Sequence, residues 1–160
     1  AIFALIDNVI ERSPIIWIYA VKGSRGSITS WIDNHKSYND LPDDVKEKCK
    51  KIKFTCGFKK GGYTDDPFFR EHHNTKLKHN LVYTNEAGVT GLFFPYLQIL
   101  DGVPKDLYEY LKNHILQDKY RYDHYWEDGD VVISEQWLTI HKRHAFEKMN
   151  ERLMYRIAID

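Results

Sequence analysis

The chain has 160 residues and a mass of 19.0 kDa, enough for one domain with its own core but not for two. Its 23 Lys and Arg balance 23 Asp and Glu, and this zero net charge argues against a broad electrostatic surface for nucleic acid or an anionic membrane. With 42% hydrophobic and 29% charged residues, the composition is that of a folded globular protein, and no apolar run is long enough to span a bilayer.

No repeat or low-complexity tract divides the sequence, so residues 1–160 are interpreted as a single domain. The apolar segment 1–9 lacks a basic start and a small-residue cleavage site, so we do not expect a signal peptide. Two cysteines, Cys49 and Cys56, are too few for a disulfide framework. Together these features favour a cytoplasmic protein, with its oligomeric state left open.

The first predicted elements are a strand and two short helices. Residues 15–21 are β-branched and aromatic, and since both faces of this strand are apolar we expect both to be buried. Residues 27–32 lead toward a helix capped near Asp33 or Asn34. Residues 41–44 (Leu-Pro-Asp-Asp) open a second helix, because they place a proline and two carboxylates in its first turn.

The middle of the chain predicts a strand, a loop and a hairpin. Residues 52–58 alternate and indicate a strand, whereas the polar residues 59–78 indicate a long surface loop. Two short apolar runs, 81–84 and 90–94, flank a turn-forming segment and predict a hairpin.

The last third predicts one helix followed by strands. Residues 104–117 carry leucine and isoleucine at four-residue spacing and start with a proline, as in an amphipathic helix. A tight turn at 127–130 precedes a strand at 131–133, and further strands are predicted at 137–141 and 152–159. Many short strands with few helices indicate a mostly β domain with flanking helices, a barrel or sandwich of the jelly-roll type.

The C-terminal residues resemble one family. Residues 128–133 (Asp-Gly-Asp-Val-Val-Ile), then His141, then Arg152 and Arg156, match the C-terminal signature of the taurine dioxygenase-like (TauD/TfdA) family of iron(II), 2-oxoglutarate-dependent oxygenases. In that family a turn and strand lead to a metal-binding histidine, and an arginine eleven residues later binds 2-oxoglutarate. Arg152 and Arg156 are an even number of residues apart, so on one strand both side chains would point to the same face.

Four upstream segments extend the resemblance over nearly the whole chain, in the family's order. Residues 26–31 look like its Gly-Gly-Asp-Thr-x-Trp segment, and residues 37–42 look like the junction that follows it. Residues 79–82 and 91–94 look like the two sides of its hairpin.

The resemblance implies a double-stranded β-helix fold (cupin-like, clavaminate synthase-like) and an enzyme that hydroxylates a small molecule with Fe(II), 2-oxoglutarate and O2. By this resemblance, His141 and Asp7 would bind the metal, and Thr29, Arg152 and Arg156 would bind 2-oxoglutarate. The aromatic residues Phe93 and Trp137 are weaker candidates for the wall of a substrate pocket.

The sequence departs from the family at the metal motif His-x-Asp. Asp7 can be the carboxylate, but Leu5 stands where the proximal histidine belongs. An iron(II) site of this class uses two histidines and one carboxylate. The departure leaves two interpretations: the chain is incomplete at its N-terminus, which we favour, or the protein has lost iron chemistry.

Simpler interpretations stand beside each assignment. His141 and Arg152 are also compatible with an ordinary strand histidine and a solvent-facing arginine. The protein as a whole is also compatible with a catalytically inactive jelly-roll relative that acts as a binding or structural protein, or with a metal-free small-molecule-binding jelly roll. A zinc site at His72, His73 and His79 is disfavoured, because no cysteine accompanies these histidines and adjacent residues point apart on a strand.

Overall fold

The computed structural model describes residues 15–57, 77–96, 99–147 and 151–159. Its strands are β1 (Ile15–Lys22), β2 (Ile28–Asp33), β3 (Lys53–Gly57), β4 (Lys78–Asn80), β5 (Val82–Thr84), β6 (Thr90–Leu92), β7 (Ile99–Asp101), β8 (Arg121–Tyr125), β9 (Val131–Glu135), β10 (Thr139–Arg143) and β11 (Leu153–Ile159). Its helices are α1 (Asn34–Asn39), α2 (Asp43–Lys50), α4 (Lys105–Ile115) and the short 3-10 helix η2 (Asp118–Tyr120). Within these ranges no helix has the length and apolar character needed to cross a membrane.

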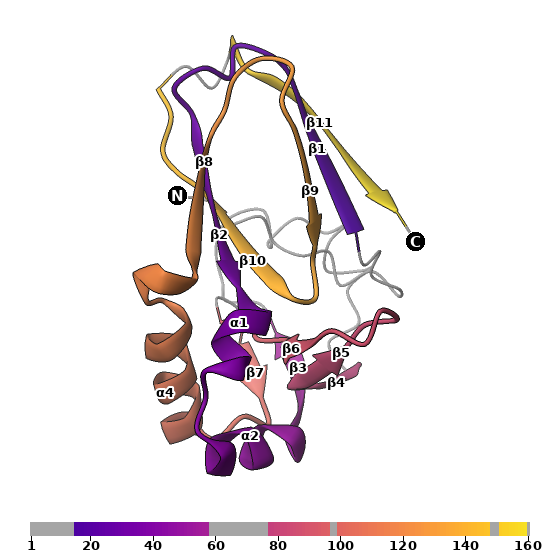
Figure 1. Ribbon diagram of the computed structural model, residues 1–160, viewed down its shortest axis with the longest axis vertical. Coiled ribbons are helices and arrows are strands. Elements are labelled where there is room, and N and C mark those ends of the chain that lie inside the picture. Colours follow the sequence, from indigo (N-terminus) through magenta and orange to yellow (C-terminus); the bar gives the residue numbers. More distant parts are fainter. Residues whose placement is uncertain (1–14, 58–76, 97–98, 148–150, 160) are drawn as a thin grey trace.

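Two three-stranded antiparallel sheets dominate the architecture, with strand orders β11-β1-β9 and β10-β2-β8. Figure 1 shows them in the upper part of the molecule, with the helices and the short strands β3 to β7 gathered below. Each sheet therefore combines a central strand from the start of the described chain with edge strands from its last forty residues. The prediction of a mostly β domain with flanking helices is confirmed.

The turns at one end of the two sheets are tied together by a carboxylate. Asp128 accepts hydrogen bonds from the backbone N–H groups of Gly23 (3.1 Å) and Ser24 (2.8 Å). Gly129 N also donates to the carbonyl oxygen of Ala20 at 2.7 Å. These contacts fix the turn between β8 and β9 against the segment that links β1 to β2.

Strand β1 is buried on one face only, so the expectation of burial on both faces is wrong. Ile16 and Ala20 are fully buried, whereas Trp17 and Tyr19 are each 41% exposed. Side chains alternate along a strand, and only one face of β1 meets the other sheet. The outward face of this sheet is nevertheless apolar: its exposed side chains include Val131, Ile133, Tyr155 and Ile157.

The segment after β2 folds as its capping residues predict. Asp33 caps α1, where its side chain accepts a hydrogen bond from Lys36 N at 2.8 Å. Pro42 precedes α2, and Asp43 and Asp44 occupy the first turn of that helix. Both helix starts are confirmed, because local backbone chemistry determines them.

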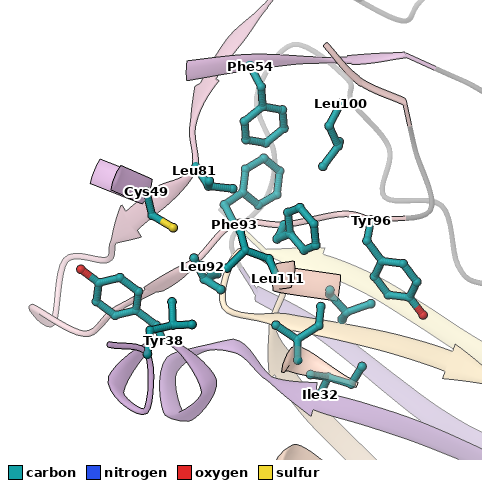
Figure 2. Close-up of a cluster of buried hydrophobic side chains, with 14 of the residues drawn as sticks. Ile32, Tyr38, Cys49, Phe54, Leu81, Leu92, Phe93, Tyr96, Leu100 and Leu111 are labelled. Atoms are coloured by element: carbon teal, nitrogen blue, oxygen red, sulfur yellow. The ribbon is translucent and has the colours of Figure 1, made fainter. Parts of the chain in front are cut away.

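The lower part of the molecule surrounds the main hydrophobic core. Figure 2 shows side chains of this core, which come from β2, β10, the helices, the short strands and the segments that adjoin those strands. The amphipathic helix is confirmed as α4, whose Leu111 and Ile115 are fully buried. The hairpin is confirmed as β5 and β6, and the strand predicted at 52–58 as β3.

Two predicted boundaries need comment. The strand expected at 137–141 runs instead over Thr139–Arg143 as β10, and the last strand begins just after Arg152. Of the predicted loop at 59–78, residues 59–76 lie outside the described ranges, and Lys78 already belongs to β4.

Close packing between β6 and α1 requires a glycine at position 91. A Cβ atom there would lie 2.9 Å from the carbonyl oxygen of Asn34, from Cα of His35 and from Cδ2 of Leu138. Two of these three atoms belong to the main chain near the start of α1, which cannot move independently of the helix. The hairpin thus approaches the helix as closely as its backbone permits.

We predict that Gly91→Ala lowers the free energy of unfolding by about 1–3 kcal/mol, because the added methyl group overpacks this contact. Urea denaturation measures the change. Gly57→Ala is the matched control, since a Cβ at position 57 meets Ile99 at an ordinary 3.5 Å. Equal effects of the two substitutions would contradict this account of the packing.

Candidate functional site

One face of β2 gathers the polar side chains that the sequence singled out. In the sheet register, Thr29 lies opposite His124 and Arg143, and Trp31 lies opposite His141. Residues paired across neighbouring strands point to the same face of a sheet. The predicted metal ligand His141 and the predicted 2-oxoglutarate contact Thr29 are therefore on a common face.

The second sheet supplies the opposite wall. Ala20, Trp31 and Trp126 form a buried cluster, and Val132 and Met154 pack against it. Ala20, Val132 and Met154 come from β1, β9 and β11, whereas Trp31 comes from β2. The candidate site thus lies between the two sheets, with apolar walls.

His141 is held as a neutral imidazole. Burial, together with the nearby positive charge of Arg156, lowers its pKa to about 4. Its ring stacks on Trp31, with 5.9 Å between the ring centroids and an interplanar angle of 29°. A neutral imidazole is the form that binds a metal ion, so the environment suits a ligand role near neutral pH.

Arg156 lies near His141, as its effect on the histidine requires. Its Nη2 donates a hydrogen bond to Oε1 of Gln136 at 3.1 Å. Gln136 follows β9 and is itself buried. The guanidinium is thus held at the edge of the space between the sheets.

Arg152 is a half-buried cation without a paired anion among the described residues. Its Nε is buried without a hydrogen-bond partner, and among the described residues no carboxylate forms an ion pair with it. Burial lowers the pKa of Arg152, and the positive charge of Arg143 adds to the effect. Burying a charge is costly unless it is paired, so this arrangement favours an anionic ligand such as a carboxylate.

Trp126 connects Arg152 to Thr29. The indole Nε1 donates a hydrogen bond to Oγ1 of Thr29 at 2.9 Å, and Cζ of Arg152 lies 5.9 Å from the centroid of the indole ring. Sequence reasoning assigned no role to Trp126, Arg143 or Gln136. For these three residues, the only sequence signal of a role was the position of Trp126, directly before the predicted turn at 127–130.

The structure does not place three other predicted site residues in this group, and all the predicted site roles stay predictions. Asp7, like Leu5, lies outside the described residues. Phe93 and Trp137 belong to or pack against the main core, with 4.9 Å between their ring centroids, and their role as pocket wall stays a prediction. Within the described ranges, no group of three or more His, Cys, Asp or Glu side chains is arranged to hold a metal ion.

Comparison with known proteins gives a consistent result. Residues 10–158 match the family model described as "Taurine catabolism dioxygenase TauD, TfdA family". The chain is 23% identical over 159 residues to pentalenolactone F synthase of Streptomyces avermitilis, a match that covers 84% of this chain and 51% of the relative. The synthase of Streptomyces arenae is 33% identical over 90 residues, covering 52% of this chain and 30% of that protein.

Solved structures share the fold. AAD-2 in complex with Mn(II) and N-oxalylglycine aligns with a TM-score of 0.76 at 17% identity, covering 98% of this chain and 66% of that one. A taurine dioxygenase from Burkholderia xenovorans also aligns with a TM-score of 0.76 at 17% identity, covering 98% of this chain and 55% of that one. The predicted double-stranded β-helix is therefore confirmed, and the chain spans about half to two thirds of the length of these relatives.

We predict that the pKa of His141 makes the protein less stable in mild acid. Between pH 6.5 and about 4, an unfolded chain protonates this histidine while the folded chain does not, so unfolding is favoured as the pH falls. The contribution is at most about 1.4 kcal/mol for each pH unit in that window. Urea denaturation from pH 4.5 to 7 should show a flatter dependence for His141→Gln than for the wild type, and parallel curves would contradict the assignment.

Proposed function

Because the chain belongs to the TauD/TfdA family of dioxygenases, we propose that the space between its two sheets binds 2-oxoglutarate. We further propose that the whole protein couples this co-substrate, with iron(II) and O2, to the hydroxylation of a small molecule. The chain covers only part of its relatives' length, so these activities are proposed and not transferred from any one relative.

The unpaired Nε of Arg152 is the observation that carries the proposal. A guanidinium presents N–H donors in a planar fork that matches a carboxylate. The far carboxylate of 2-oxoglutarate would neutralise Arg152 and the neighbouring Arg143 charge. Thr29 contacts Trp126, as Arg152 does. Thr29 would supply a further contact to the same carboxylate.

His141 would hold the metal beside the keto-acid end of the co-substrate, with Asp7 as a second ligand. Its low pKa supports this role, because the ring need not lose a proton before it binds a metal ion. Bound together, the metal and 2-oxoglutarate would supply the oxidising chemistry. The protein's own contribution would be placement of the reactants and exclusion of water.

The substrate itself is proposed only as a small molecule, with Phe93 and Trp137 as candidate contacts. The related AAD-2 structure contains Mn(II) and N-oxalylglycine, and both are suitable probes for this chain. Mn(II) can replace the oxidisable iron, and N-oxalylglycine carries the two carboxylates that the proposed site would bind.

A second candidate function is a protein that binds 2-oxoglutarate without iron chemistry. The observation in its favour is the donor set: Leu5 occupies the position of the proximal histidine, and the described residues offer His141 but no group of three metal-capable side chains. The two candidates differ in metal binding, not in co-substrate binding, so separate titrations distinguish them.

We predict that Arg152→Lys weakens the binding of 2-oxoglutarate at least tenfold, since a point charge replaces a planar pair of donors and such charge-assisted bonds contribute about 1.5–3 kcal/mol. Isothermal titration calorimetry with 2-oxoglutarate and N-oxalylglycine measures the effect. Arg25→Lys is the matched control, because Arg25 is exposed and pairs with Glu127 on the surface. Wild-type affinity in the Arg152 variant would place the anion elsewhere.

We predict that His141→Ala abolishes the binding of Mn(II) or anaerobic Fe(II) while the protein stays folded. The alanine removes the proposed ligand atom but leaves the pairing of β10 with β2 intact. Metal titration followed by circular dichroism of the same samples provides the measurement. Metal affinity unchanged from the wild type would refute the metal role of His141, and a wild type that binds 2-oxoglutarate but no metal would favour the second candidate.

A further inference from the structure

Trp126 contacts both residues proposed to bind the far carboxylate of 2-oxoglutarate. Its side chain is 1% exposed and lies between the two sheets. The edge of the indole donates to Thr29, and Arg152 lies near the ring. The two partners come from β2 and from the residue that precedes β11, at opposite ends of the described chain.

The hydrogen bond determines how Thr29 can act. An indole N–H is a donor only, so Oγ1 of Thr29 must be the acceptor of the 2.9 Å bond. The threonine hydroxyl proton then points away from Trp126, and the structure shows no hydrogen bond from this hydroxyl to another described residue. A carboxylate oxygen is an acceptor only. Trp126 therefore leaves Thr29 oriented as a donor for an anion.

The ring restricts Arg152 at the same time. A guanidinium at 5.9 Å from the ring centroid is within the range of an attractive cation–π contact. Burial lowers the pKa of Arg152 and repulsion from Arg143 adds to this effect, while Nε of Arg152 has no hydrogen-bond partner among the described residues. The attraction to the ring counteracts this repulsion and keeps the unpaired donor inside the site.

We propose that Trp126 is a positioning residue for the co-substrate: it aims the Thr29 hydroxyl and the Arg152 guanidinium at one carboxylate of a dicarboxylate. The inference rests on the proposed function and adds to it a residue that touches the binding groups and not the reacting atoms. A residue that merely fills space between the sheets would give the same burial but no dependence on the N–H group.

The test is a double-substitution experiment read by isothermal titration calorimetry on the full chain with Mn(II) present. Trp126→Phe removes the N–H donor but keeps an aromatic ring beside Arg152, whereas Thr29→Val removes the acceptor. Each should weaken N-oxalylglycine binding about tenfold, the size of one hydrogen bond to a charged group. The double variant should bind no more weakly than Thr29→Val alone, because both changes break the same bond.

Two controls separate positioning from simple packing. Thr29→Ser keeps the hydroxyl and should retain wild-type affinity. Pyruvate has the keto-acid end of 2-oxoglutarate but not its far carboxylate, so its affinity should be the same in the wild type and in Trp126→Phe. A general loosening of the two sheets would weaken pyruvate and N-oxalylglycine alike, and that result would overturn the inference.

A spectroscopic measurement covers the case in which Trp126→Phe does not fold. In protein labelled with ¹⁵N at the indole nitrogens, the Trp126 signal is identified as the one that moves in Thr29→Val. Saturating N-oxalylglycine should also shift this signal, since the hydrogen-bonded hydroxyl gains an acceptor. Binding that leaves the signal unchanged would overturn the inference.

The outcomes also separate this inference from the proposed function. Trp126→Phe with affinity within twofold of the wild type, while Arg152→Lys loses binding, would remove Trp126 from the site and leave the 2-oxoglutarate proposal standing. A folded wild type that binds neither 2-oxoglutarate nor N-oxalylglycine would overturn both.

Discussion

The pairing of the two central strands is the constraint on which the rest of the structure depends. β1 and β2 each hydrogen-bond on both sides to strands from the last forty residues, and the register of those pairs decides which side chains face inward. A shift of one residue in β2 would turn Thr29 and Trp31 outward and bring their polar and apolar neighbours into the site. The register of the sheets therefore decides which side chains can form the site.

The same packing gives the site its electrostatic character. Arg152 is half-buried beside an apolar cluster, and two further arginines lie close by: Arg143 near Arg152, and Arg156 near His141. Burial lowers the pKa of both His141 and Arg152, and the charges of Arg156 and Arg143 respectively lower them further. A folded chain maintains this concentration of positive charge only at a cost in stability, which an anionic ligand would relieve. The repulsion between like charges and the proposed preference for a dicarboxylate would thus have one physical origin.

The sequence predicted those features that depend on local chemistry or spacing. Asp33 and Pro42 marked the helix starts, and alternation marked the last strand on which Arg156 lies. It could not predict that β1 exposes Trp17 and Tyr19, because an apolar run does not reveal whether a second layer covers its outer face. Trp126 was missed for a related reason: its partners Thr29 and Arg152 are distant in sequence, and only the fold brings the three together. Asp7 and residues 59–76 of the predicted loop lie outside the described residues, so their roles stay predictions.

The strand order also has a consequence for how the molecule folds. β3 pairs with β4 and β7, and β5 pairs with β6, over shorter separations along the chain than β1, which pairs with β11, the last described strand. Pairing β1 with β11 requires the two ends of the described chain to meet. The chain loses the entropy of this loop closure before its inward side chains gain their contacts. Assembly of the lower core first would shorten the loop that remains to be closed. During synthesis on the ribosome, β1 must therefore wait without its partners until β9 and β11 have emerged, and Ile16 and Ala20, which the folded structure buries, are open to other proteins in the meantime.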